Sequence, residues 1–169
     1  MDQLNFPISS LEVAKGMTSE VVQLTEPGNA HSPERLAYTG WLRRLKSSGH
    51  VIYAGFYSAV QLPGEPNPCV KVTFPCDGST NVYLCPVAHP DGSFGLDSSS
   101  SAWGRSGFYR VVQSGPEHWR VRYVKTLDEL FRVYLDNEGI LRTDHTISFL
   151  GLTIIRLHYK MSLASALRP

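Results

Sequence analysis

Residues 119–161 read WRVRYVKTLDELFRVYLDNEGILRTDHTISFLGLTIIRLHYKM and decide the fold class of this chain. Apolar and polar side chains alternate through much of this stretch. Successive side chains of a β-strand point to opposite faces of a sheet, so alternation indicates a strand with one buried face. Residues 141–149 and 152–161 are therefore predicted to form two long strands, or one strand broken at Gly151.

His145 lies on the apolar face that alternation assigns to the first of these strands. Thr143 and Ile147 share its face, whereas Asp144 points to the other, so Asp144 and His145 cannot form a dyad on a regular strand. A neutral imidazole among apolar side chains can take or give a proton beside a bound substrate, which makes His145 the candidate catalytic residue. The alternative is a buried structural histidine that is hydrogen-bonded to a backbone carbonyl or a tyrosine.

Residues 126–139 allow two predictions. Five apolar side chains have helical spacing, and Thr126 with Glu129 resembles a capping box. Residues 131–135 also alternate, and Asp136–Gly139 has the composition of a hairpin loop. A strand at 130–136 is favoured; a helix at 127–136 would shift the fold toward α+β.

A helix is predicted over residues 33–47. Ser32 can cap it, Pro33 suits its first position and Glu34 complements its dipole. One apolar face recurs at helical spacing, formed by Tyr38, Trp41, Leu42 and Leu45.

The remaining pattern predicts strands and hairpins. A possible strand covers residues 20–24 and another covers 51–60. Two hairpins are predicted, from residues 69–74 with 81–87 and from 108–113 with 118–125.

These elements predict a mainly β fold in a single domain, residues 1–169. An N-terminal segment (1–30) and the helix (33–47) would precede an antiparallel sheet (51–161) and a tail (162–169). Seven to nine strands would form an antiparallel β-barrel or a strongly curved sheet, with one flanking α-helix. The alternative is an α+β cone-shaped barrel with helices in its mouth.

Composition narrows the function classes. The chain of 169 residues has a net charge of +1 and 18% charged residues. This balance counts against nucleic-acid binding. No stretch reaches the ~20 apolar residues of a membrane helix. No secretory signal is visible, so a cytoplasmic location is expected.

The three cysteines, Cys69, Cys76 and Cys85, are predicted to be reduced thiols, because their number is odd and the chain shows no secretory signal. Their spacing matches no zinc motif. If residues 76–80 form the turn of a hairpin, Cys85 faces a residue near Val72. The sequence therefore predicts neither a disulfide nor a metal site.

Aromatic residues with polar atoms can line a pocket and orient a ligand. The predicted substrate-binding set is Trp103, Tyr109, Trp119, Tyr123, Tyr134 and Tyr159. Trp103 lies in a Gly/Ser-rich loop that could act as a lid, and core packing is the alternative for the whole set. Two outward basic rows are also predicted, Arg120, Arg122 and Lys125 after His118, and Arg156, His158 and Lys160.

The leading hypothesis is binding of a hydrophobic small molecule in the barrel interior. His145 would then act as the acid/base of a cofactor-independent isomerase, cyclase or lyase, and no cofactor motif occurs. The alternative is a non-catalytic protein-interaction domain that uses the basic rows. A thiol enzyme using one of the cysteines is a third hypothesis. The sequence assigns no oligomeric state.

Overall fold

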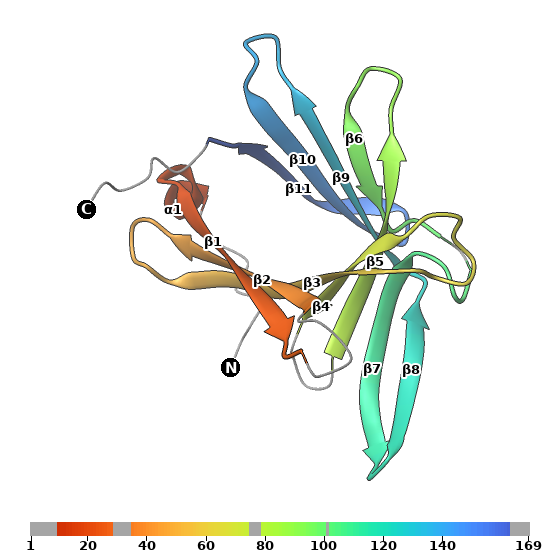
Figure 1. The fold of residues 1–169 in the computed structure, drawn as a ribbon. Helices are drawn as coiled ribbons and strands as arrows, with labels where there is room; N and C mark the ends of the chain where they lie inside the picture. The colour runs from red at the N-terminus through yellow and green to blue at the C-terminus, as the bar shows by residue number, and fades with distance from the viewer. Residues whose placement is uncertain (1–9, 29–34, 75–78, 101, 163–169) are drawn as a thin grey trace. The chain divides into compact units, whose positions relative to one another are not determined.

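The computed structural model describes residues 10–28, 35–74, 79–100 and 102–162. These residues are mainly β and antiparallel (Figure 1), as the sequence predicts. A short helix, α1 (Ser10–Ala14), precedes the strands. The strands are β1 (Met17–Glu26), β2 (Arg35–Leu45), β3 (Val51–Val60), β4 (Cys69–Phe74), β5 (Ser79–Ala88), β6 (Phe94–Asp97), β7 (Gly107–Gly115), β8 (His118–Val124), β9 (Leu127–Leu135), β10 (Leu141–Phe149) and β11 (Leu152–Lys160).

Hydrogen bonds join the strands in the order β1-β2-β3-β4-β5-β6-β9-β10-β11, while β7 pairs with β5 and β8. The described residues thus hold eleven strands, against the seven to nine expected; β2 and β6 are the two that the sequence did not predict. The chain divides into two compact units. The first comprises Met1–Val60, Val70–Val82 and Tyr109–Arg122; the second comprises Gln61–Cys69, Tyr83–Phe108 and Tyr123–Pro169.

An aromatic cluster marks the first unit. Trp41 lies opposite Val21 on β1 and opposite Gly55 on β3. Its ring packs edge-on against Tyr53, at 6.1 Å between centroids, and against Tyr57 at 5.6 Å. The two tyrosine hydroxyls are hydrogen-bonded to each other. Because a β-carbon on Gly55 would lie 2.6 Å from the Tyr53 hydroxyl, the glycine makes this arrangement possible.

The helix predicted for residues 33–47 is wrong, because Arg35–Leu45 is strand β2. Neighbouring strands pair with β2 on both sides, so strand pairing outweighs the helical spacing of its apolar residues. The guanidinium of Arg43 lies 4.2 Å from the centroid of the Trp41 ring, two residues away, and a strand places such residues on one face. The predicted caps at residues 32–34 lie outside the described residues.

The second unit contains β6, β9, β10 and β11 as hydrogen-bonded neighbours. Residues 127–135 form β9, so the strand prediction for 130–136 is confirmed and the helical alternative is wrong. Leu96, Phe131, His145 and Leu157 are register partners in succession across these four strands. They form a cross-strand row on the face that alternation assigned to His145. The tail predicted for 162–169 lies outside the described residues from residue 163 onward.

A disulfide joins Cys69 on β4 to Cys85 on β5, with their Cα atoms 4.5 Å apart, so the prediction of reduced thiols is wrong for these two residues. The prediction failed because it assumed a different register for the hairpin of β4 and β5. The Thr73 hydroxyl donates to the Asn81 side chain at 2.8 Å, and these residues stand four positions along each strand from the cysteines. A regular antiparallel register therefore places Cys85 opposite Cys69 and not near Val72.

Candidate functional site

His145 forms a buried pair with Glu129. Its Nε2 atom lies 2.7 Å from a carboxylate oxygen of Glu129, and the residues are 9% and 8% exposed. Glu129 on β9 lies opposite Ile147 on β10, and His145 stands two residues before Ile147. This diagonal relation puts the carboxylate and the imidazole on the same face within hydrogen-bond reach.

Phe131 fixes the plane of the imidazole. It lies directly opposite His145, and the two rings stack with their centroids 4.0 Å apart at an angle of 18°. The ring of His145 is therefore held at its edge by a carboxylate and on one face by an aromatic ring. Such support from two sides restricts both torsions of the histidine side chain.

Ser98 holds the backbone of Glu129 in place. Ser98 is fully buried, and its hydroxyl accepts a hydrogen bond from the Glu129 N–H at 2.7 Å. The Ser98 N–H donates to the Glu129 carbonyl at 3.0 Å. These two bonds tie the segment after β6 to β9 beside the histidine pair. The orientation of the carboxylate is thus supported by a third segment of the second unit.

Glu129 was not predicted as a partner of His145. It was assigned to a possible helix cap, because the apolar residues around it also have helical spacing. The available signal was alternation: Glu129 and Phe131 fall on one face of a strand, with Leu130 on the other. Only the register between β9 and β10 brings that face to His145.

The side chains around the pair are apolar and half-buried. Val133, Ile147 and Leu157 lie on the same face as His145 and keep partial exposure. Thr143 is buried, and its hydroxyl contacts the sulfur of Met161 at 3.7 Å. This face of the second unit is therefore apolar and accessible beside one ionisable pair.

One of the predicted aromatic residues lies on this face. Tyr159 is half-buried on β11 opposite Thr143, two residues from the partner of His145. Tyr134 lies on the other face of β9, where the Arg132 guanidinium is 5.8 Å from its ring centroid. The Tyr123 hydroxyl donates to the Ser100 carbonyl, and Trp103 is 63% exposed.

The two other predicted aromatic residues belong to the first unit. Tyr109 is buried, with 5% exposure, and Trp119 is 60% exposed. The predicted outward row of Arg120 and Arg122 alternates with Trp119 and Val121, and all four residues are exposed.

The opposite face of β10 and β11 carries an exposed polar pair. Asp144 and His158 are register partners, with 2.6 Å between the carboxylate and Nδ1. Asp144 and His145 thus point to opposite faces, as predicted. The Asp144–His158 pair is chemically similar to Glu129–His145 but exposed, so it serves as a matched control.

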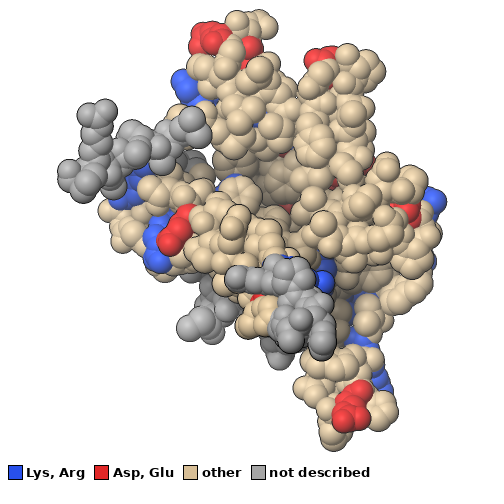
Figure 2. Space-filling view, in the orientation of Figure 1, with Lys and Arg blue, Asp and Glu red and all other residues tan. Residues whose placement is uncertain are grey.

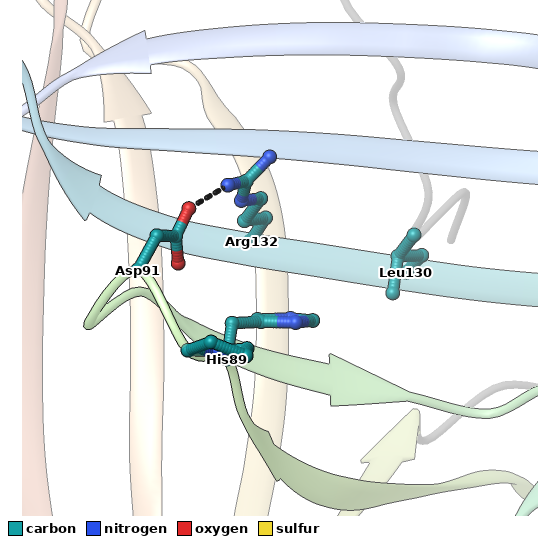
Figure 3. A pocket seen from close by; sticks show the side chains of 5 residues that line it. His89, Asp91, Leu130 and Arg132 are labelled. Carbon is teal, nitrogen blue, oxygen red and sulfur yellow. Dashed lines mark hydrogen bonds and ion pairs between the residues drawn. The ribbon is translucent and has the colours of Figure 1, made fainter.

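A pocket of about 480 Å³ opens on the same polar face (Figure 3). His89, Pro90 and Asp91 line it from the β5–β6 connection, and Leu130 and Arg132 line it from β9. Arg132 is ion-paired with Asp91, so its charge is already neutralised.

The carboxylate of Asp91, which lines this pocket, has a lowered pKa. Hydrogen bonds from the hydroxyl and the backbone N–H of Ser93, together with Arg132, lower the pKa of Asp91 to about 2. Asp91 therefore stays ionised, and the pocket keeps its internal ion pair, over the whole physiological range.

No protein-family model matches the chain, and neither the curated proteins nor the solved structures include a match. Within the described ranges, no group of three or more His, Cys, Asp or Glu residues is placed to hold a metal ion. The one helix there is too short to cross a membrane.

Proposed function

We propose that the chain binds a hydrophobic small molecule against the His145 face of its second unit and transforms it by proton transfer. The observation that carries this proposal is the buried 2.7 Å contact between His145 and Glu129 among half-buried apolar side chains. A carboxylate held against an imidazole is a recurrent arrangement for general acid–base catalysis. The apolar surroundings favour an apolar substrate.

Hydrogen bonding defines the role of each ring nitrogen. An ionised carboxylate only accepts hydrogen bonds, so the Nε2–H group of His145 donates a hydrogen bond to Glu129. In the neutral ring the basic lone pair then resides on Nδ1. Among the described residues, no group is hydrogen-bonded to Nδ1. This nitrogen is the one that would take the proton of a substrate.

The reaction class follows from this single base. Nδ1 removes a proton from a carbon or hydroxyl of the substrate, and the imidazolium that forms is stabilised by the Glu129 carboxylate. Return of the same proton to another atom of the substrate completes an isomerisation with no net gain or loss of atoms. Cyclisation and elimination use the same proton transfers, and none of these reactions requires an external oxidant or reductant.

Native mass spectrometry of the freshly purified protein, followed by organic extraction, tests the binding step. We expect an apolar compound to be released at near-stoichiometric amount. A protein that shows only its apo mass, and that binds no compound from a hydrophobic panel, would contradict the proposal.

Turnover of the released compound tests the chemistry. His145→Gln should lower the rate at least about a hundredfold, as expected for loss of a general base. His158→Gln, in the exposed Asp144 pair, is the matched control and should retain the wild-type rate. Equal rates for wild type and His145→Gln would restrict the function to binding.

A further inference from the structure

Strand β8 presents an unpaired edge. β7 pairs with β5 on one side and β8 on the other, whereas β8 pairs with β7 alone among the described strands (Figure 1). One row of backbone N–H and C=O groups of β8 therefore lacks a strand partner. Residues 118–122, all in the first unit, are exposed at every position. Proteins commonly protect such edges, because an exposed edge can pair with another chain.

The side chains of β8 have the composition of a binding surface. Trp119 is 60% exposed and Val121 is 46% exposed. They alternate with Arg120 and Arg122, which are exposed on the other face. Tryptophan and arginine are the residues most enriched among those that dominate binding energy at protein interfaces. An exposed Trp next to two exposed arginines on a free edge is thus a strong candidate for an interface.

Charge selects the kind of partner. Residues 109–122 contain three arginines and one glutamate, a net charge of +2, whereas the whole chain carries +1, so the rest carries −1. Arg120 and Arg122 form no ion pair with any described residue. Figure 2 shows a surface of mostly uncharged side chains with scattered basic and acidic residues. Pairing of two β8 strands from two copies would bring their arginines together, which disfavours self-association here.

We propose that β8 binds an acidic, extended segment of a partner protein by strand addition. The segment would extend the sheet through backbone hydrogen bonds to the free edge of β8. Its carboxylates would face Arg120 and Arg122, and its alternate apolar side chains would pack on Trp119 and Val121. A strand satisfies the row of unpaired backbone groups, which a nucleic acid does not, so the edge favours a peptide. This interaction uses none of the residues of the His145 site.

Fluorescence anisotropy with a labelled peptide of eight alternating glutamate and valine residues tests the proposal. We expect the wild type to bind it, and the pair of substitutions Arg120→Glu and Arg122→Glu to weaken binding at least about tenfold. The matched control reverses two exposed charges at the end of β2, which is paired on both sides, Arg44→Glu and Lys46→Glu, and should bind like wild type. No binding by the wild type, or equal losses in both variants, would overturn the proposal.

Hydrogen exchange of wild-type amides provides a readout that needs no variant. Strand addition predicts slower exchange of alternate β8 amides when the peptide is bound. A peptide that alternates glutamate with proline cannot donate these hydrogen bonds and should not bind. Unchanged β8 exchange, equal binding of the proline peptide, or tighter binding of an oligothymidylate of equal charge would each contradict strand addition.

Discussion

Glu129 is the residue on which the orientation of the His145 ring depends. Replacing it by Ala leaves a buried imidazole N–H without its acceptor, and an unsatisfied buried group of this kind costs about 1–3 kcal/mol. We therefore expect Glu129→Ala to lower the free energy of unfolding by that amount in urea titrations. Asp144→Ala removes the exposed counterpart and should change it by less than about 1 kcal/mol. Equal losses in the two variants would show that burial of the first pair has no energetic consequence.

Asp91 predicts a dependence of stability on pH. Its pKa is lowered from 3.8 to about 2 in the folded chain, so the folded state favours the ionised form. The contribution of ionised Asp91 to the stability of the fold is fully present above the pKa that Asp91 has in the unfolded chain. It is lost as the pH falls toward 2. Wild type should therefore be more stable than Asp91→Asn at pH 7, and the two should converge near pH 2. Denaturant titrations between pH 2 and 7 measure this; a difference that does not shrink at low pH would contradict it.

The site also shows what the pattern of residues in a single strand can and cannot predict. Alternation placed His145 on the apolar face and Asp144 on the other, and both assignments are confirmed. The pattern within one strand contains no information on the register with the next. Glu129 and Phe131 become neighbours of His145 through the β9–β10 register alone, and therefore sequence analysis missed them.

At the scale of elements, β7 begins at a glycine position where any residue with a β-carbon would be strained. Gly107 has a φ of +139°, and a β-carbon there would lie 2.5 Å from Cε2 of Tyr123. Gly107→Ala should therefore destabilise the chain by about 1–3 kcal/mol. Gly115→Ala, at the other end of β7, meets only ordinary contacts from 3.5 Å and is the control. Equal unfolding midpoints for the two variants would contradict this account of the start of β7.

The disulfide between β4 and β5 predicts the number of reactive thiols. The chain has three cysteines, and Cys69 and Cys85 are bonded to each other, so one thiol should react with an alkylating reagent in denaturant without reductant. Reduction opens a cross-link between residues 16 apart and should cost about 3 kcal/mol of stability. Mass spectrometry counts the labels. Three labels without reductant would show that the disulfide is absent.

Elements were predicted well where local pattern and pairing agree. β3, β10 and β11 follow directly from alternation and turn residues, and the structure confirms them. β2 was predicted as a helix because its apolar residues have helical spacing as well. Pairing with β1 on one side and β3 on the other makes this segment a strand. Such long-range pairing is not visible in a local pattern.

At the scale of the whole molecule, the two proposed sites lie in different compact units and share no residue. The proposed functions should therefore be separable. His145→Gln should leave binding of the acidic peptide unchanged, and the double charge reversal on β8 should leave turnover of the extracted compound unchanged. Peptide anisotropy and turnover assays on both variants check this. Loss of both activities in either variant would indicate a shared structural defect.

We propose that Glu129 holds the His145 ring with Nδ1 free to act as the base. Nitrogen NMR of histidine-labelled protein, with the compound released by extraction added stepwise, tests it most directly. We predict a proton on Nε2, and an Nδ1 resonance that shifts as the compound binds. A proton on Nδ1, or a ring whose resonances do not respond to the compound, would contradict the account.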